Sequence, residues 1–413
     1  MEPGGVQVTF REALGVWFKI GCLGFGGPAG QIALMHRVLV DEKKWVEEQR
    51  YLHALNFCML LPGPEAQKLA TYVGWLLHGT RGGLAAGALF VLPGALVMLA
   101  VSLLYVLGQG IPAVEGALFG IKAAVLVIVV EALLRIGRRG LKTRLLLGVA
   151  AAAFVGIFFL DLPFPLIVAA AGAVGFFTTQ RQEAPGKERD PARWQQSMRA
   201  LLAGLALWLA PIALVVASLG VDHVMFDIAA FFSKLAVVSF GGAYALLAYM
   251  AQQAVESYGW MSAPEMVDGL GLAETLPGPL IKVTQFVGFL AAYRDAAPFS
   301  PVGAAVLGSA LSTWVTFALP MTLIFAGAPY IERLRSNARL SGALAAITAA
   351  VVGVILNLTL WFAWHVLFPA GAVDWKTCGL TLVAALLMLG LHRGLIETVA
   401  VMAVLGMLSR LLL

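Results

Sequence analysis

The sequence predicts an all-α membrane protein that crosses the bilayer many times and is built from two related halves. Hydrophobic residues make up 60% of the 413 residues and charged residues only 12%, whereas soluble domains are about a quarter charged. Long apolar runs such as 84–107 and 145–160 recur along the chain, and about 20 apolar residues are enough for a helix to span a bilayer. Because the runs are continuous and do not alternate, they favour helices over a membrane β-barrel.

A polar stretch divides the chain nearly in half. Residues 178–197 (TTQRQEAPGKERDPARWQQS) are of mixed charge and carry prolines, which fits a cytoplasmic linker. An apolar helix at 201–220 follows and has no counterpart in the first half. In the first half we expect helices near 14–38, 51–78, 84–107, 114–135, 143–160 and 163–180.

The two halves are related by a constant offset of 215 residues. Over 19–64 against 234–279 there are 13 identities in 46 positions aligned without gaps. The matches include FGG with FGG, a tryptophan, and LPGP with LPGP. A one-residue deletion then aligns Lys68 with Lys282. Chance matching of apolar residues does not produce such an ordered set, so the sequence predicts a duplication.

The basic residues predict that the two halves insert with opposite orientations. Lys and Arg are dense at 135–144, which predicts a cytoplasmic loop, while the turns at 108–113 and Asp161 carry none. The helix at 201–220 adds one crossing, so the second half should carry its basic loops at the opposite positions. Residues 332–339 (ERLRSNAR) are indeed basic where the matching first-half loop is neutral. The N-terminus is therefore predicted to be cytoplasmic and the C-terminus outside.

We accordingly predict three parts: an N-terminal repeat (1–180), a linker with a connecting transmembrane helix (181–225), and a C-terminal inverted repeat (226–413). Two inverted-topology six-helix repeats with broken helices, plus one linking helix, give about 13 transmembrane spans. This pattern is typical of secondary transporters, which hold the substrate near the midplane. Whether the FGG and LPGP segments span or re-enter stays open. If both segments of a half re-enter, the orientation of everything that follows is unchanged.

Each half contains two interruptions of an apolar helix. The LPGP stretches at 61–64 and 276–279 put two prolines into one turn, which ends a helix. The stretches GFGGPAG (24–30) and SFGG (239–242) let the backbone approach a ligand and can form an anion-binding concavity. A break also exposes N–H groups at the positive end of a half-helix, so the pattern favours a site for a small oxyanion. The alternative is that the Gly-Gly pairs are close-packing surfaces between helices.

Lysines in apolar surroundings mark the same places. A lysine at a helix centre costs about 2.5–3.5 kcal/mol on insertion, so such residues usually have a function. Lys19 and Lys234 are paired by the repeat, each six residues before its FGG, and Lys68 and Lys282 are paired just after LPGP. We expect these four as anion ligands. Lysines near helix ends also snorkel to the headgroups, which stays the alternative for Lys19.

Acidic residues lie near the breaks as well. Glu65 and Glu274 are expected at the substrate site, where they either neutralise the neighbouring lysines or carry a coupling proton. Lys122 has Thr348 as its counterpart in the other half and is expected to be structural.

Other classes of function find little support in the sequence. The six histidines show no HExxH or similar pairing, and no Walker sequence or Asp-rich metal motif occurs. Cys22, Cys58 and Cys378 have no metal or redox spacing and are expected to be buried thiols. The start of the chain shows no secretory signal, and the net charge of +5 reflects cytoplasmic loops rather than nucleic-acid binding. We therefore expect no enzyme activity, no cofactor and no metal.

The motifs FGGPAGQIALMHR (25–37), LPGPEAQ (61–67), SFGGAYA (239–245) and AETLPGPLI (273–281) resemble those of the chromate ion transporter family in its long, two-domain form. The resemblance covers nearly the whole chain. It implies a carrier in the bacterial inner membrane that exports chromate and gives chromate resistance, with sulfate as a structural analogue. Lys68 and Lys282 lie outside the family motifs. Carried over residue by residue, those motifs fall on Gly26, Gly27, Pro28, Pro62, Gly63, Pro64, Glu65, Gly241, Gly242, Pro277, Gly278 and Pro279.

Export of a dianion fits the electric field across such a membrane. Moving two charges outward at roughly 150 mV releases about 7 kcal/mol, or roughly a 10⁵-fold gradient, without ATP. Chromate and sulfate share charge and shape, so the alternatives remain a carrier for sulfate or another tetrahedral oxyanion, transport inward, an anion channel, and a membrane-embedded enzyme. The small-residue face at 116–120 could either build a homodimer or pack internally.

Overall fold

The structure is a computed structural model that describes residues 8–179, 191–240, 243–328 and 338–411. The described residues are helical throughout, with turns between the helices and no strand among them, which confirms the predicted all-α class. The helices of the first half are α1 (Phe10–Leu23), α2 (Gly27–His36), η1 (Arg37–Glu42), α3 (Glu48–Leu60), α4 (Glu65–Leu107), α5 (Pro112–Gly140), α6 (Arg144–Leu160) and α7 (Phe164–Thr178).

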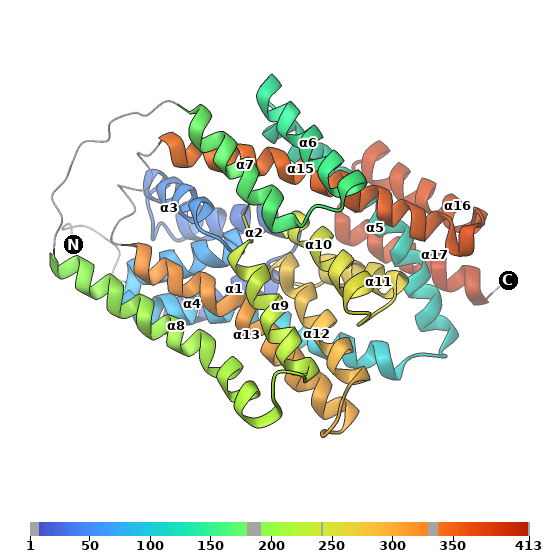
Figure 1. Ribbon diagram of the computed structural model, residues 1–413, viewed down its shortest axis with the longest axis horizontal. Coiled ribbons are helices and arrows are strands. Elements are labelled where there is room, and N and C mark those ends of the chain that lie inside the picture. Colours follow the sequence, from blue (N-terminus) through green and yellow to red (C-terminus); the bar gives the residue numbers. More distant parts are fainter. Residues whose placement is uncertain (1–7, 180–190, 241–242, 329–337, 412–413) are drawn as a thin grey trace.

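The second half follows the same order after one additional helix, α8 (Pro191–Leu219), which lies along α13 at one edge of the molecule (Figure 1). Its other helices are α9 (Val224–Val237), α10 (Ala243–Gln252), η2 (Gln253–Ser257), α11 (Ala263–Thr275), η3 (Leu280–Lys282), α12 (Val283–Arg294), α13 (Pro301–Gly327), α15 (Ala338–Leu367), η5 (Pro369–Gly371), α16 (Trp375–Ala385), η6 (Leu386–Gly390) and α17 (Leu395–Leu411).

Several of these helices are suited to crossing a bilayer. Five described helices are long and apolar enough: α4, α5, α8, α13 and α15. Shorter apolar helices cover 144–160, 164–178 and 375–390. The chain is thus a multi-pass membrane protein, as the composition predicts.

Helix α4 is too long for a single crossing. It has 43 residues, or about 65 Å at 1.5 Å per residue, against about 30 Å of hydrocarbon. Non-helical backbone angles at His78 and Gly79 (φ 60°, ψ −152°) interrupt it. A half-helix from Glu65 is thereby separated from a longer stretch that ends at Leu107.

The broken segments of the first half fold back on themselves. The Lys43 ammonium contacts the Glu12 carboxylate at 2.8 Å, and the His78 ring lies 2.8 Å from the Val8 carbonyl. The beginning of α1, the connection after α2 and the end of the first part of α4 therefore lie together. The two ends of each broken segment therefore lie at the same side of the protein, so the 14–38 and 51–78 segments are helical hairpins.

The second half repeats this arrangement. The His223 ring lies 2.6 Å from the Ala297 carbonyl. Arg294 donates to the Trp260 carbonyl at 2.5 Å and to Glu265 at 2.6 Å. The start of α9, the start of α11 and the end of α12 thus meet, so this half also contains two hairpins. The predicted figure of about 13 spans counts these four hairpins as crossings, and it stays a prediction beside the five described helices that are long and apolar enough to span a bilayer.

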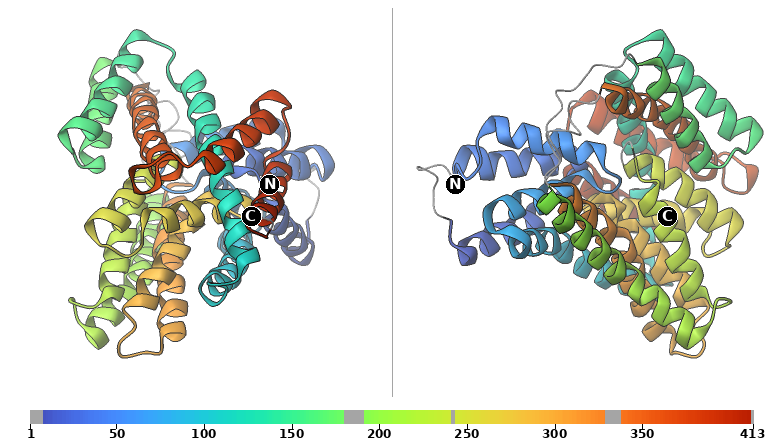
Figure 2. Two further views of the ribbon diagram at one scale, coloured as in Figure 1. Left: turned by 90° about the vertical axis from the view of Figure 1, so that its right-hand side faces the viewer. Right: turned by 60° about the vertical axis from the view of Figure 1, so that its left-hand side comes forward.

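Glycines let the long helices pack closely. A Cβ on Gly120 would collide with the Met402 carbonyl of α17, and one on Gly175 with the Gly342 carbonyl of α15. The face at 116–120 is therefore occupied inside the protomer, and it lends no support to a homodimer. Figure 2 shows the resulting shape, in which α6, α7 and α15 form an arm on one side and α8, α9, α12 and α13 lie on the other.

Candidate functional site

The predicted breaks occur at the tips of the hairpins, and three of the four lie wholly within the described residues. Left-handed glycines mark three of them: Gly26 (φ 82°) before α2, Gly63 (φ 109°) before α4 and Gly278 (φ 93°) before η3. In the fourth, Gly241 and Gly242 lie outside the described residues, between the end of α9 and the start of α10. Each break ends one half-helix and begins another, so the backbone reverses direction deep inside the protein.

The tips of the two halves bind each other through the backbone. The Gly278 N–H donates to the Gly24 carbonyl at 2.9 Å, and the Gly63 N–H donates to the Ser239 carbonyl at 3.0 Å. Gly24 and Ser239 are separated by 215 residues, as are Gly63 and Gly278. The two hydrogen bonds are therefore the same contact made twice with the halves exchanged.

The breaks also fit against the proline-bearing helices of the opposite half. A Cβ on Gly63 would collide with the Pro320 ring of α13, and a Cβ on Gly94 of α4 would collide with the Pro277 carbonyl. Two features therefore require glycine at position 63: its φ is positive, and Pro320 leaves no room for a Cβ atom. The close approach locks each LPGP stretch to the other half of the protein.

A small cavity of about 30 Å³ lies among the four tips. That size suits a small ion rather than a drug-sized ligand, whose pockets occupy about 300–1,000 Å³. Helices α2, α4 and α10, and the η3 turn that leads into α12, all begin at or beside this cavity. The lining residues are Pro28, Gln31, Gly63, Pro64, Glu65, Ala66, Leu235, Ala236, Ser239, Ala243, Leu246, Pro279, Leu280, Ile281 and Thr316.

Helix N-termini surround this cavity. The first N–H groups of a helix lack intrahelical partners and carry the positive end of the helix dipole. Several helix starts beside one small space are an arrangement that favours an anion without a lysine. Glu65 is the one ionisable residue among the described lining residues, and its carboxylate repels an anion.

Lys68 and Lys282 lie behind the breaks and outside the cavity lining. Both are about 1% exposed. The Lys68 ammonium donates to the Leu61 carbonyl, and the Lys282 ammonium donates to the carbonyls of Leu276 (2.8 Å) and Gly278 (3.3 Å). Leu61 and Leu276 are equivalent in the two halves. Each lysine thus satisfies backbone carbonyls left free where the preceding half-helix ends.

The other predicted charged residues take different positions. Lys19 and Lys234 lie on exposed helix faces, and the Lys234 ammonium is 5.5 Å from the Tyr249 ring centre. Glu274 is buried and accepts a hydrogen bond from the Tyr244 hydroxyl at 2.8 Å. None of the three is among the residues that line the cavity described above.

The structure therefore brings together only part of the predicted set. Pro28, Gly63, Pro64, Glu65 and Pro279 line the cavity. Gly26 and Gly27 form the turn into α2, and Pro62, Pro277 and Gly278 shape the two LPGP breaks. The three cysteines are free thiols, of which Cys58 is buried and Cys22 and Cys378 are half-buried.

The sequence reading did not single out Gln31. Its side-chain amide donates to the Gly24 carbonyl at 3.1 Å and to the Gly278 carbonyl at 2.7 Å, which ties a tip of one half to a tip of the other. Its equivalent in the second half is Leu246, so this bridge is made on one side. A glutamine in an apolar half-helix directly after FGGPAG was the available signal.

Polar groups at the ends of the first-half hairpins hold those ends together. The His36 ring is 2.5 Å from Glu48 and 3.3 Å from Asp41. The hydrogen bond to Glu48 is the main reason why the pKa of His36 is raised above its ordinary value. These contacts join the end of α2 to the start of α3 and keep the first hairpin beside the second.

Comparison with known proteins gives a consistent result over most of the chain. The family model described as chromate transporter matches residues 11–176 and 226–409. A chromate transport protein of Pseudomonas aeruginosa is 33% identical over 385 residues, which cover 92% of this chain and 86% of that protein. A chromate transport protein of Cupriavidus metallidurans is 27% identical over 383 residues, which cover 92% and 88% respectively. No solved structure matches the chain.

Proposed function

Because the chain belongs to the chromate transporter family, we propose that it is a secondary carrier that exports chromate from the cytoplasm across the bacterial inner membrane and so confers chromate resistance. The transported species is a tetrahedral dianion, and sulfate is its structural analogue. The observation that carries the proposal is the cavity among the four hairpin tips, at or beside which helices from both halves begin.

The paired hydrogen bonds at the tips support an inverted repeat. Gly278 with Gly24 and Gly63 with Ser239 are equivalent contacts related by the 215-residue offset. Two copies that exchange the same contact are related by an approximate two-fold axis. With the extra helix α8 between them, we infer that this axis lies in the membrane plane and that the halves, 1–180 and 226–413, insert oppositely.

The proposed topology has the four hairpins entering from both sides. The hairpins of the first half enter from the cytoplasm, since their connection at 37–50 carries Arg37, Lys43, Lys44 and Arg50. The equivalent connection at 252–263 has no Lys or Arg and faces outside. The hairpins leave the parity unchanged, so the N-terminus is cytoplasmic and the C-terminus lies outside.

Transport in this scheme uses the tips as a shared substrate site. The dianion binds to N–H groups of the half-helices at the midplane, and alternating access moves one repeat against the other around it. Outward movement is driven by the inside-negative potential. Since Glu65 opposes an anion in the cavity, we propose that it binds a proton when the dianion is present.

Chromate flux in everted membrane vesicles, with the potential clamped, tests the proposal. We expect potential-driven accumulation of labelled chromate that saturates and that sulfate inhibits. The Glu65→Gln variant should still accumulate chromate, with a weaker dependence on pH than the parent. Absence of flux of both anions, with folded protein in the membrane, would refute the carrier. Flux that does not saturate and shows no counterflow would indicate a channel.

A further inference from the structure

A second cavity, of about 250 Å³, lies where the turn between α4 and α5 meets α11 and the end of α17. It shares no lining residue with the cavity at the hairpin tips. It lies beside the start of α5, at the opposite end of that helix from the basic cluster at 135–144. In the proposed topology it therefore faces outside. Its ionisable lining residues are Tyr105, Glu115, Lys122, Asp268 and Arg410.

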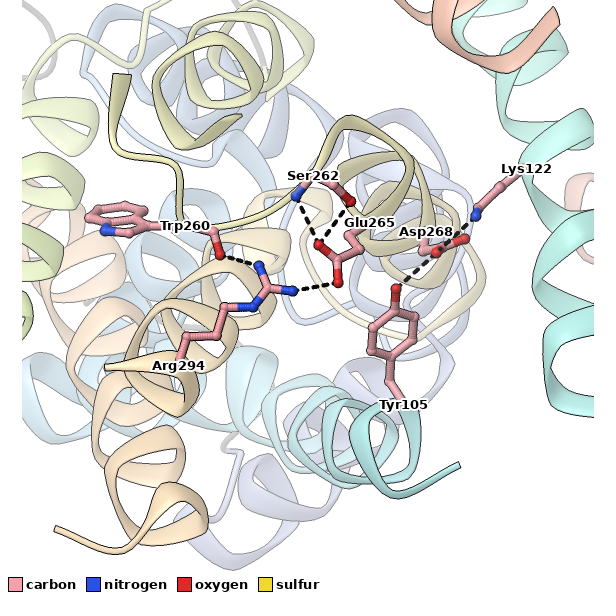
Figure 3. Close-up of polar contacts among 7 residues, drawn as sticks. All are labelled: Tyr105, Lys122, Trp260, Ser262, Glu265, Asp268 and Arg294. Carbon is pink, nitrogen blue, oxygen red and sulfur yellow. Dashed lines mark hydrogen bonds and ion pairs between the residues drawn. The ribbon is translucent and has the colours of Figure 1, made fainter. Parts of the chain in front are cut away.

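Asp268 is the buried acid of this cavity. It is 3% exposed, and its Oδ2 atom accepts a hydrogen bond from the Tyr105 hydroxyl at 2.9 Å and lies 3.2 Å from the Lys122 ammonium (Figure 3). Both contacts use the same oxygen. The Oδ1 atom is buried and has no hydrogen-bond partner among the described residues. The carboxylate is thus held by Tyr105 and paired with Lys122, while half of its acceptor capacity is unused.

The two partners differ in their access to the cavity. The Lys122 side chain is 26% exposed, whereas the Asp268 side chain is 4% exposed. Breaking a buried ion pair is costly when one charge is left alone. An anion that enters the cavity can replace Asp268 at Lys122, the partner that the cavity reaches, so the ammonium stays paired. The cost then falls on the buried Asp268, which keeps only its hydrogen bond from Tyr105.

We propose that the Lys122 ammonium is an outward-facing binding site for the transported dianion and that the Asp268 carboxylate is its exchangeable counter-ion. The inference rests on the proposed function and adds a second station for the substrate. As a dianion arrives from the hairpin tips, Lys122 turns from Asp268 to an oxygen of the anion, while Tyr105 keeps its hydrogen bond to Asp268. Asp268 then competes for Lys122 and promotes release to the outside.

The neighbouring ion pair on α11 provides a matched control. Glu265 lies one turn before Asp268 and binds Arg294 at 2.6 Å, and it also accepts hydrogen bonds from Ser262 (Figure 3). It does not line the cavity of Lys122. The Glu265→Gln change therefore removes a carboxylate from the same half-helix without removing the proposed competitor.

The test measures the external sulfate concentration that half-inhibits chromate transport in vesicles of native orientation. Lys122→Gln should raise this concentration about tenfold or more, the effect of losing one charge-assisted hydrogen bond. Asp268→Asn should lower it, since the competing charge is gone. Lys122→Arg should stay near the parent, and Glu265→Gln should leave the value unchanged. The chromate concentration that half-saturates transport from the cytoplasmic side, measured in everted vesicles, should be the same in the parent and in all of these variants.

A single variant could fold poorly because it leaves one charge of the pair without its partner. The double variant Lys122→Gln with Asp268→Asn removes both charges and so tests the proposal without that defect. It should show the weak external binding of Lys122→Gln. Equal external values in the parent, both single variants and the double variant would overturn the inference while leaving the carrier intact. A rise of the same size in Lys122→Gln and Asp268→Asn would also overturn it, since the pair would then be structural. A parent protein without chromate or sulfate flux would refute both proposals.

Discussion

Lys68 and Lys282 act on the backbone of the breaks that precede them. A helix that ends inside a membrane protein leaves carbonyl groups without partners, and water is not at hand to replace them. An ammonium group carries three donors, and here Lys68 donates to one LPGP carbonyl and Lys282 to two. A lysine after each break is therefore explained by the orphaned carbonyls, whether or not the same charge also attracts an anion from a short distance.

We predict that Lys68→Ala and Lys282→Ala each weaken chromate transport several-fold without preventing membrane insertion. Each change exposes one or two buried carbonyls, which cost about 1–3 kcal/mol apiece, so the purified variants should also melt earlier. Vesicle flux and thermal unfolding in detergent measure the two effects. Lys376→Ala, which removes an exposed lysine, is the control. Parent-like flux and melting in both variants would contradict a role for either lysine.

A second residue-scale prediction concerns Gly63. Gly63→Ala imposes a side chain at a positive φ and forces it into Pro320, whereas Gly110→Ala imposes the strain alone, since Gly110 (φ 86°) has open space around it. Positive φ costs a non-glycine residue about 1–2 kcal/mol. We expect loss of most chromate flux for Gly63→Ala and near-normal flux for Gly110→Ala. Equal losses in the two variants would show that contact with Pro320 is unimportant.

At the scale of elements, the half-helices are held by contacts between tips rather than by their own length. Helices α1, α2, α3 and α10 have 10 to 14 residues, which is too short for a stable isolated helix in water. The FGG tip of each half meets the LPGP tip of the other half, and Gln31 adds a bridge on one side. Movement of one hairpin must therefore break bonds to a hairpin from the opposite half.

We predict that Gln31→Leu, which gives the first half the residue found at Leu246, weakens the connection between the two tips. It removes two side-chain hydrogen bonds worth about 0.5–1.5 kcal/mol each and keeps the Gly278 to Gly24 backbone bond. Melting should fall by a few degrees, and the chromate transport rate should change at least about twofold. Gln49→Leu, on an exposed position of α3, controls for the loss of an amide. Unchanged transport and melting in Gln31→Leu would show that the Gln31 hydrogen bonds do not stabilise the contact between the two tips.

At the scale of the whole molecule, the hairpins make a prediction that separates them from full crossings. If 14–38 were one crossing, its following connection would lie outside, whereas a hairpin returns it to the cytoplasm. In a variant without the native cysteines, Glu47→Cys should react with an impermeant thiol reagent from the cytoplasmic side. Ser257→Cys, at the equivalent connection of the second half, should react from the outside. Labelling of both positions from one side would contradict the inverted arrangement.

Much of this arrangement can be predicted from the sequence, because the repeat, the breaks and the basic loops are local patterns. The 215-residue offset predicts that Gly24 is equivalent to Ser239 and Gly63 to Gly278. These four residues meet at the tips, where Gly24 contacts Gly278 and Gly63 contacts Ser239. Hairpins and full crossings have the same composition, so hydropathy does not separate them. What decides is a long-range contact such as Glu12 with Lys43.

The direction of a side chain is the other feature that sequence does not determine. The positions of Lys68 and Lys282 after the breaks predict that they face a ligand. Their ammonium groups instead reach back to carbonyls of the preceding turn. A lysine side chain is long enough to take either direction, so the sequence does not decide between them. No sequence pattern singles out Asp268, because its partners Tyr105 and Lys122 are distant in the chain. Lys122 has Thr348 at the equivalent position of the repeat, which predicts a structural role. Its ion-pair partner is instead Asp268, on a helix of the other half.

The exchanged contacts at the hairpin tips have a consequence for how the protein is made. The Gly63 N–H finds its partner only when residue 239 has been synthesised, and the Gly24 carbonyl receives its backbone donor only when residue 278 has followed. Until then the first half stays in the translocon or in the lipid without these two backbone hydrogen bonds. Closure of the centre is then a late step in biogenesis, and a chain that stops before residue 278 has no means of completing it.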